Sequence, residues 1–242
     1  MALRGLFVTG TDTGAGKTVV AAAIAAALHA RGERVAAFKP VVTGVGGGAG
    51  GPAAHAGGAE AGVAPWPDDH DLLAAVTGAR PEDVAPVTFA PAVSPHLAAE
   101  LAGTRLVLDD LVAAAHARAA GADVLVAEGV GGLLVPFGDE ASVRDLAAAL
   151  GLPVVVAARP GLGTINHTLL TLEAARAAGL DVRAVVLTPW PADPSAMERS
   201  NRETIARLGR VDVATLPPVR PEAAELARAG DALALDAWLA PR

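Results

Sequence analysis

The sequence predicts an α/β fold of three layers, in which helices flank a mostly parallel central sheet. Short apolar runs, many of them β-branched, alternate with longer stretches of helical spacing, as they do in βαβ units. Hydrophobic residues make up 52% of the chain and charged residues 19%, a balance typical of a folded globule. Because 242 residues suit one sizeable α/β domain and no internal repeat is visible, we assign residues 1–242 to a single domain.

The expected strands are short runs rich in apolar residues, and those at 123–128, 153–157 and 182–188 are of the buried type found when helices cover both faces of a parallel sheet. In chain order they are residues 3–9, 34–39, 123–128, 153–157, 182–188 and 210–216. Pro40 ends the second run, and Pro217-Pro218 follow the last.

The expected helices lie between these runs and after the last of them. They are residues 18–31, stopped by Gly32, and residues 142–150, 164–178 and 221–239. Ser142 and Thr164 stand at the entry of two of these helices, where a side-chain oxygen can cap free amide groups.

One segment, residues 44–67, is rich in Gly, Ala and Pro and shows no periodicity. We interpret it as a mobile surface loop. Because it follows Lys39-Pro40 and precedes an acidic stretch, it could act as a substrate lid; a tolerated insertion explains it equally well.

Composition and charge exclude several classes of protein. The net charge is −7 and no basic stripe is visible, which argues against nucleic acid as a partner. No apolar run approaches the roughly 18–20 residues of a membrane span, and residues 1–8 lack a signal-peptide pattern. The absence of cysteine removes disulfides, thiolate metal sites and a Cys nucleophile. We therefore expect a cytoplasmic protein.

Residues 10–18, Gly-Thr-Asp-Thr-Gly-Ala-Gly-Lys-Thr, form a phosphate-binding loop between the first strand and the first helix. Glycines let successive N–H groups turn toward phosphates, and the helix N-terminus adds partial positive charge. Lys17 would reach the β- and γ-phosphates, and Thr18 would offer its hydroxyl to Mg²⁺. The sequence therefore predicts a P-loop NTPase-type protein, with nucleotide contacts at Thr13, Gly14, Ala15, Gly16, Lys17 and Thr18.

The loop departs from the general pattern, because Thr11 stands where a glycine is usual and Gly10 lies one residue earlier. In this form, Gly-Thr-Asp-Thr-x-x-Gly-Lys-Thr, it resembles the loop of the dethiobiotin synthetase family. Four further segments match that family in its own order. They are residues 38–44 (Phe-Lys-Pro-Val-Val-Thr-Gly), 94–96 (Ser-Pro-His), 128–132 (Glu-Gly-Val-Gly-Gly) and 162–167 (Leu-Gly-Thr-Ile-Asn-His). The segments are short but jointly specific, and the resemblance runs from residue 4 to about residue 190.

The resemblance implies an ATP- and Mg²⁺-dependent ligase of biotin biosynthesis. Members of the family carboxylate 7,8-diaminopelargonate with CO₂ and close the cyclic urea dethiobiotin, releasing ADP and phosphate. A carbamate attacks the γ-phosphate, and the second amine then closes the ring on the mixed anhydride. The family also implies a homodimer with active sites at the interface.

Carried over by position, the family assigns the chemistry to a small set of side chains. Lys17 and Lys39 neutralise charge on the transferring phosphoryl group, and Lys39 also contacts the carbamate. Thr13 and Thr43 are hydroxyl partners of the carbamate and the diamine. Gly14 stands where some relatives carry an acidic residue, so no carboxylate contact is expected there.

The magnesium ligands follow from the same resemblance, since Mg²⁺ prefers hard oxygen donors and keeps several waters. We expect Thr18, Asp71 and Glu128 to supply them, with Glu128 at the carboxyl end of a strand and close to the nucleotide. Asp68 and Asp69 compete with Asp71, and any of the three could instead cap the helix that starts near Leu72.

The substrate's carboxylate tail is expected at a helix N-terminus formed by Gly163, Thr164, Ile165 and Asn166 of the neighbouring subunit. A plain helix start capped by Thr164 is the alternative interpretation. His96 and His167 are interpreted as structural.

Base recognition is where the match fails. Relatives often place Asn-Asp after the strand that ends near Leu187, whereas this chain has Thr188, Pro189 and Trp190. Pro lacks an N–H donor and Trp can stack on any base. We assign these three residues to nucleotide binding and predict a relaxed or altered base preference.

Three other classes share part of the pattern. A ParA/MinD-like ATPase switch carries a second Lys early in its loop, where this chain has Thr11, Asp12 and Thr13. Glutamine-fed amide synthetases need a Cys-dependent domain, which a chain without cysteine cannot supply. A nucleotide-binding regulatory subunit is disfavoured by the family match alone.

Overall fold

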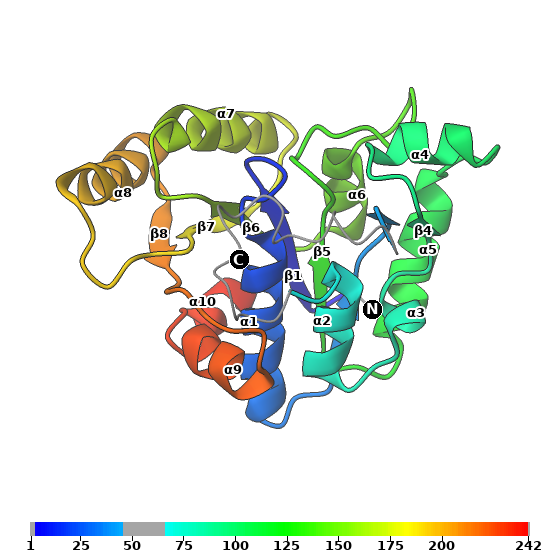
Figure 1. The fold of residues 1–242 in the computed structure, drawn as a ribbon, viewed down its shortest axis with the longest axis horizontal. Helices are drawn as coiled ribbons and strands as arrows, with labels where there is room; N and C mark the ends of the chain where they lie inside the picture. The colour runs from blue at the N-terminus through cyan, green and yellow to red at the C-terminus, as the bar shows by residue number, and fades with distance from the viewer. Residues whose placement is uncertain (1–2, 46–65, 242) are drawn as a thin grey trace.

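The computed structural model describes residues 3–45 and 66–241, so most of the segment expected as a loop at 44–67 lies outside the described residues. Six parallel strands form the central sheet, in the order β2-β5-β1-β6-β7-β8 (Figure 1). Their bounds are β1 Gly5–Gly10, β2 Val35–Phe38, β5 Val124–Glu128, β6 Val154–Ala158, β7 Val182–Leu187 and β8 Asp212–Thr215. All six strands predicted from apolar runs are confirmed. A separate parallel pair, β3 Val42–Thr43 and β4 Thr88–Phe89, was not predicted.

Helices cover both faces of this sheet (Figure 1). The helices that pack into the core on one face are α1 Lys17–Ala30, α2 Asp69–Thr77, α3 Pro81–Val84, α9 Ala223–Asp231 and α10 Leu235–Leu239. Those on the other face are α4 Pro95–Leu101, α5 Leu108–Ala119, α6 Val143–Leu150, α7 Thr164–Ala177 and α8 Ala196–Gly209. The predicted class, three layers around a parallel sheet, is confirmed.

Alternation along the strands divides the core into these two layers. In β1, Leu6 and Val8 point toward α1, whereas Phe7 points to the opposite layer, as the two-residue period of a strand requires. All three side chains are fully buried. A strand with both faces covered therefore shows no polar alternation, which explains why the strands read as apolar runs.

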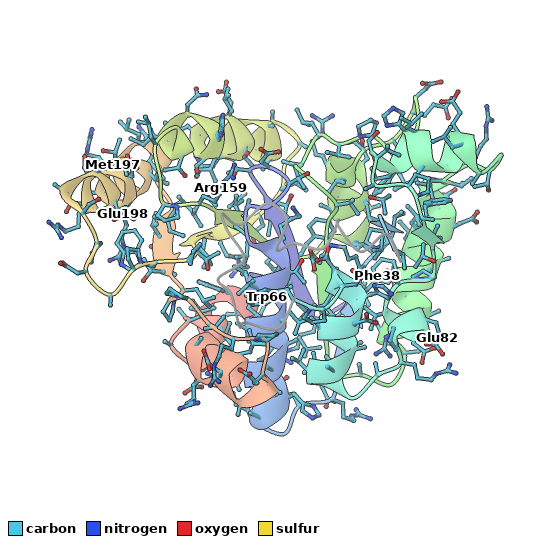
Figure 2. The ribbon with its side chains drawn as sticks, in the orientation of Figure 1. Phe38, Trp66, Glu82, Arg159, Met197 and Glu198 are labelled. Atoms are coloured by element: carbon cyan, nitrogen blue, oxygen red, sulfur yellow. The ribbon has the colours of Figure 1, made fainter. Side chains whose placement is uncertain are left out.

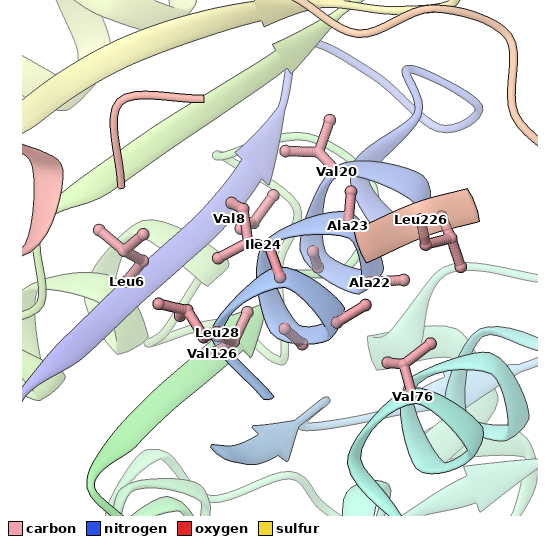
Figure 3. Close-up of a cluster of buried hydrophobic side chains, with 14 of the residues drawn as sticks. Leu6, Val8, Val20, Ala22, Ala23, Ile24, Leu28, Val76, Val126 and Leu226 are labelled. Atoms are coloured by element: carbon pink, nitrogen blue, oxygen red, sulfur yellow. The ribbon is translucent and has the colours of Figure 1, made fainter. Parts of the chain in front are cut away.

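The P-loop helix α1 is held unusually close to its neighbour α9. Its alanines are buried along most of its length, and Figure 3 shows Ala22 and Ala23 beside Leu226 of α9. A Cβ added to Gly230 would stand 2.0 Å from the Ala23 carbonyl oxygen, so this crossing requires glycine. Small side chains on both helices fix the axis of α1, and with it the position of the phosphate-binding loop.

The helix predictions are confirmed in position but not in every boundary. The stretch 221–239 divides into α9 and α10, and α5 and α8 were not predicted. Ser142 does stand at a capped start, where its N–H and hydroxyl both donate to Asp145 Oδ2. Thr164 is not a cap: Gly163, with φ 91°, is the N-cap of α7, and Thr164 is buried in its first turn.

Candidate active site

The phosphate-binding loop joins β1 to α1 at the carboxyl edge of the sheet, where open α/β sheets bind ligands. Gly16 is the N-cap of α1, with φ 89°, a left-handed conformation that strongly favours glycine. Its position admits no side chain for a second reason: an added Cβ would lie 2.4 Å from the Thr188 methyl carbon. The loop after β7 therefore packs directly on the phosphate-binding loop.

A cluster of buried polar groups lies beside this loop, contributed by four separate elements. Lys39, which follows β2, is 2% exposed and places Nζ 2.5 Å from Glu128 Oε1 and 2.6 Å from Asp69 Oδ2. The Thr18 hydroxyl in α1 lies 2.8 Å from Asp69 Oδ1 and 2.9 Å from the same Glu128 oxygen. One cation and one hydroxyl thus hold two carboxylates together.

The electrostatics of the cluster follow from burial opposed by close charges. Burial works against the charge on Lys39, but Asp69 and Glu128 outweigh it and raise the pKa of the ammonium. The same contact with Lys39 overcomes burial at Asp69 and lowers the pKa of its carboxyl group. Glu128 is fully buried, and burial raises its pKa.

Lys17 forms the other positive group of the site. Its Nζ donates to the Asp12 carbonyl oxygen at 3.0 Å, so the side chain folds back over its own loop. Burial and then the nearby Lys39 lower the pKa of Lys17 to about 8. Lys17 and Lys39 are the chain's two lysines, so every lysine of the protein lies in this site.

Asp12 connects the loop to the next strand. Its carboxylate accepts from the Thr13 N–H at 2.7 Å and lies 3.7 Å from the guanidinium of Arg159, which follows β6. Figure 2 labels Arg159 beside the loop above β1. Both charged groups are about half exposed, so the pair is screened by solvent and contributes little to stability.

The cluster borders a cavity of about 430 Å³ that the loop, β3 and α4 enclose. Thr13, Gly14, Gly16, Lys17, Thr18, Lys39, Thr43, Asp69, Ser94 and Pro95 are among the residues that line it. Glu128, fully buried at the end of β5, completes the cluster. The structure thus brings together the loop, the segment after β2 and the Ser-Pro-His segment, which lie far apart in the sequence.

The prediction that Asp71 belongs to this cluster is not supported by the structure, which places Asp69 there instead. Asp71 has a half-exposed side chain, 3.9 Å from His70 Nε2. Asp69 and Asp71 both lie in the first turn of α2. Two residues along a helix rotate a side chain by about 200°, so the two carboxylates point to nearly opposite sides of the helix. Asp69 could have been found from periodicity, because it lies three and four residues before the buried Leu72 and Leu73.

The predicted carboxylate-binding segment lies apart from this cavity in the single chain. Gly163 and Asn166 are exposed at the start of α7, and Ile165 is half-buried. Leu162 before them is 93% exposed and Leu170 on the same helix 57%. Both leucines are therefore open, in the single chain, to contact with another protein.

Thr188 and Trp190, which follow β7, pack against different parts of the protein. Thr188 is buried against Gly16, as described above, and its peptide bond to Pro189 is cis. Trp190 instead packs with the core layer of α7 and α8, with Arg202 6.0 Å above its ring. It borders a second cavity, of about 370 Å³, formed by α8 and β8. The prediction that Trp190 stacks on a base is therefore not supported, because its ring faces α8 rather than the phosphate-binding loop.

The oxygen atoms beside the phosphate-binding loop are of the kind that binds magnesium. The described part of the chain holds no group of three or more His, Cys, Asp or Glu side chains arranged as a metal site. It does hold two carboxylates around one hydroxyl, and no described residue hydrogen-bonds Glu128 Oε2, a fully buried oxygen. Mg²⁺ takes one or two carboxylates, waters and phosphate oxygens, so the residues present fit it.

The parallel sheet, the loop and the Lys-carboxylate cluster define a P-loop protein that binds a nucleoside triphosphate. The family model described as an AAA domain matches residues 4–225. The ATP-dependent dethiobiotin synthetase of Anaeromyxobacter sp. is 43% identical over 86% of this chain and 91% of its own length. The same-named proteins of Mycobacterium sp. and Bacillus subtilis are 43% and 32% identical over 86% and 89% of this chain, and 86% and 87% of their own lengths. The chain belongs to the dethiobiotin synthetase family.

Solved structures agree with the fold. A ParA family ATPase from Chlorobium tepidum superposes with a TM-score of 0.50 at 14% identity, covering 95% of this chain and 90% of that protein. Chloroplast FtsY from Physcomitrella patens gives a TM-score of 0.50 at 15% identity, over 95% of this chain and 65% of its own. At these identities the likeness shows the fold and nothing of the activity. None of the described helices is long and apolar enough to cross a membrane.

Proposed function

We propose that this protein is an ATP-dependent dethiobiotin synthetase. It would carboxylate 7,8-diaminopelargonate with CO₂ and close the ring to dethiobiotin, with release of ADP and phosphate. The observation that carries the proposal is the buried Lys39 between Asp69 and Glu128, beside the phosphate-binding loop, in a chain 43% identical to named dethiobiotin synthetases. We propose the cytoplasm as its compartment.

The reaction requires positive charge at the β- and γ-phosphate oxygens and beside the carbamate, and the chain has one lysine for each place. When the carbamate oxygen attacks the γ-phosphorus, negative charge builds on the phosphoryl oxygens while ADP leaves. Lys17 serves the β- and γ-phosphate oxygens, and it must leave the Asp12 carbonyl oxygen to do so. Lys39 faces the γ-phosphate and the carbamate, held in place by its two carboxylates.

The second step closes the ring. The free amine of the substrate attacks the carbonyl carbon of the carbamic–phosphoric anhydride, phosphate leaves, and the attacking nitrogen loses a proton. Thr13 and Thr43 line the cavity on the side of Lys39, which supports their role as hydroxyl partners of the carbamate and the diamine. Ser94 and Pro95 line the same cavity, where exclusion of water by bound substrate would protect the anhydride from hydrolysis.

Thr18, Asp69 and Glu128 are the residues we propose for Mg²⁺, with Asp69 in place of Asp71. Held there, Mg²⁺ would neutralise the negative charge that develops on the phosphoryl group. Thr18 and both carboxylates already contact one another, so little rearrangement is needed to present three oxygens together.

We propose a homodimer in which the start of α7 from one subunit completes the site of the other. The exposed Leu162, Gly163 and Asn166 at the start of α7 support this, since none of them borders the cavity of its own chain. A Leu162→Asp variant should sediment as a monomer, with a raised KM for the diamine and nearly unchanged nucleotide affinity. Leu101→Asp, at a position 64% exposed on α4, is the matched control and should remain dimeric. An unchanged assembly and KM in the Leu162 variant would remove α7 from the interface.

The experiment that tests the activity is an incubation with ATP, Mg²⁺, bicarbonate and diaminopelargonate, followed by phosphate release and mass spectrometry. Phosphate release should require the diamine, and the product should have the mass of the cyclic urea. A ParA-like switch would instead hydrolyse ATP without the diamine. Phosphate release that ignores the diamine would overturn the assignment.

A further inference from the structure

One polar side chain lies in the contact between α7 and α8, two helices that lie side by side (Figure 1). The buried residues of α8 are Asn201, Ile205 and Gly209, which are four residues apart and so form one stripe along the helix. Gly209 allows a close approach to α7, because a Cβ added there would stand 2.8 Å from Leu172 Cδ1. Asn201, the polar member of the stripe, is 6% exposed. A buried amide needs hydrogen-bond partners, because its burial is otherwise costly.

The partners of Asn201 belong to the loop that joins β6 to α7. Its Nδ2 donates to the Pro160 carbonyl oxygen at 2.9 Å and to the Gly161 carbonyl oxygen at 3.3 Å. Both partners are acceptors, so the NH₂ end of the amide faces them. The Gly161 carbonyl oxygen also accepts from Thr164 N–H, in the first turn of α7, at 3.2 Å. Asn201 therefore holds two carbonyl groups that precede α7, and one of them is bonded to the helix itself.

These two bonds fix the direction of the neighbouring N–H groups. The peptide bonds after Pro160 and Gly161 are trans, and in a trans peptide the carbonyl and the next N–H point in opposite directions. Because both carbonyl groups face Asn201, the N–H groups of Gly161 and Leu162 face away from α8. Without the amide, the two carbonyl groups would turn toward other donors, since buried backbone acceptors are almost always paired. Both peptide groups would then rotate, directly before the start of α7.

We propose that Asn201 is a positioning residue for recognition of the substrate's carboxylate. The inference rests on the proposed function, in which the start of α7 binds the carboxylate of the substrate held by the neighbouring subunit. The N–H groups of Ile165 and Asn166, in the first turn of α7, have no partner within the helix and can bind an anion. Asn201 is too buried to touch the substrate, so it acts by holding the loop that sets the direction of this turn.

The test compares two diamines in the whole enzyme: diaminopelargonate, and 2,3-diaminooctane, which has the same diamine end and lacks the carboxylate. Asn201→Leu keeps a branched side chain of similar shape and removes the donor. We expect the KM for diaminopelargonate to rise about tenfold, with kcat, the KM for ATP and kcat/KM for 2,3-diaminooctane within about twofold of the natural chain. The ratio of kcat/KM for the two diamines should therefore fall by about tenfold.

Arg176→Met is the matched control, because Arg176 joins the same two helices at their other end. Its guanidinium, in the last turn of α7, donates to the carbonyl oxygens of Gly209 and Arg210 at 2.6 and 3.3 Å. This variant should melt at a lower temperature, as Asn201→Leu should, and keep the ratio for the two diamines. If Asn201→Leu does not fold, Asn201→Ser takes its place; its hydroxyl can serve one of the two carbonyl groups, and the ratio should fall by about threefold.

Several outcomes would overturn the proposal. An unchanged ratio in the Asn201 variant would do so, and so would an equal fall in Arg176→Met, which would make the effect one of helix packing alone. Sedimentation should show the Asn201 variant in the same assembly as the natural chain; a monomer would assign the effect to assembly and also contradict the proposal. A natural chain that treats both diamines alike would overturn the proposal together with the carboxylate site. One that releases no phosphate with either diamine would instead overturn the proposed function.

Discussion

The two halves of the sheet's carboxyl edge present a ligand with opposite kinds of chemistry. On the side of β2 and β5, charged side chains meet. Lys39 Nζ lies 2.6 Å from Asp69 Oδ2 and 2.5 Å from Glu128 Oε1. On the side of β7 and β8, neutral backbone and three prolines line the edge. The ionic half supplies full charges to a phosphoryl group, beside the amides of the phosphate-binding loop, whereas the other half offers uncharged backbone.

The largest expected effect comes from removing the cation of the ionic half. Lys39→Ala should lower kcat by about 10³-fold or more, because a charge clamp in phosphoryl transfer is lost. It also leaves Asp69 and Glu128 without their counter-ion, at a cost of about 3–5 kcal/mol of unfolding free energy. Steady-state kinetics measure kcat, and urea unfolding measures the free energy of unfolding.

Lys39→Arg is the control for that variant, since it keeps the charge and should recover stability in part. Triphosphate affinity should survive in both variants, because Lys17 and the loop amides remain. Near-normal turnover in Lys39→Ala would remove Lys39 from the mechanism.

A second test asks which acidic residue of α2 belongs to the ionic half. Asp69→Asn should lower kcat/KM by about a hundredfold and raise the Mg²⁺ concentration needed for activity, since it removes a charge that contacts Thr18 and Lys39. Asp71→Asn changes a half-exposed carboxylate two residues away and should stay within about twofold. Magnesium titrations of the two variants side by side decide the matter; the reverse ranking would restore Asp71.

A smaller effect is expected in the neutral half at Trp190. Trp190→Ala should lower the unfolding free energy by roughly 1–2 kcal/mol, because a half-buried ring and its contact with Arg202 are lost. The KM for ATP should change by less than about twofold. A large rise in KM for ATP would return Trp190 to the base site and contradict its position against α8.

The smallest effect belongs to the far end of the same strand that carries Glu128. Asp123 precedes β5 and accepts from the Arg34 side chain and N–H, contacts that lower its pKa to about 2. Because the folded pKa lies below the ordinary value of about 3.9, this pair stabilises the protein above that value and the gain is lost as pH falls toward 2.

Asp123→Asn should therefore lower the midpoint of urea unfolding slightly at pH 7, and the difference from the natural chain should shrink between about pH 4 and pH 2. Turnover should be unaffected, since Asp123 lies at the amino edge of the sheet. A difference that is constant across this pH range would exclude the ion pair as its source.

The contrast between the halves also explains what the sequence could predict. The site residues that the sequence could predict stand at the ends of elements with clear apolar runs. They are Lys17, Thr18, Lys39 and Glu128. Asp69 was missed because three aspartates lie within four residues, and only the register of α2 separates them. Trp190 was assigned to the base because its residue type allows stacking; the direction of its ring depends on α8, a helix that the periodicity did not reveal.

The sequence alone could not predict which distant segments meet at the site, for a physical reason. Lys39 and Asp69 are brought together by the packing of α2 against α1 and β2, a set of contacts between residues far apart in the chain. The segments after β7 and β8 meet through a backbone hydrogen bond from Trp190 N–H to Leu216 O, and such a bond does not depend on residue type.

The confinement of both lysines to the site makes the protein unusual toward lysine-specific reagents. The chain offers a lysine-specific endoprotease two bonds, Lys17-Thr18 and Lys39-Pro40. Lys17-Thr18 lies in the first turn of α1, and Lys39-Pro40 follows β2, with the Lys39 side chain only 2% exposed. Digestion with such an enzyme would therefore produce at most three fragments, and its rate would report how often these two segments open.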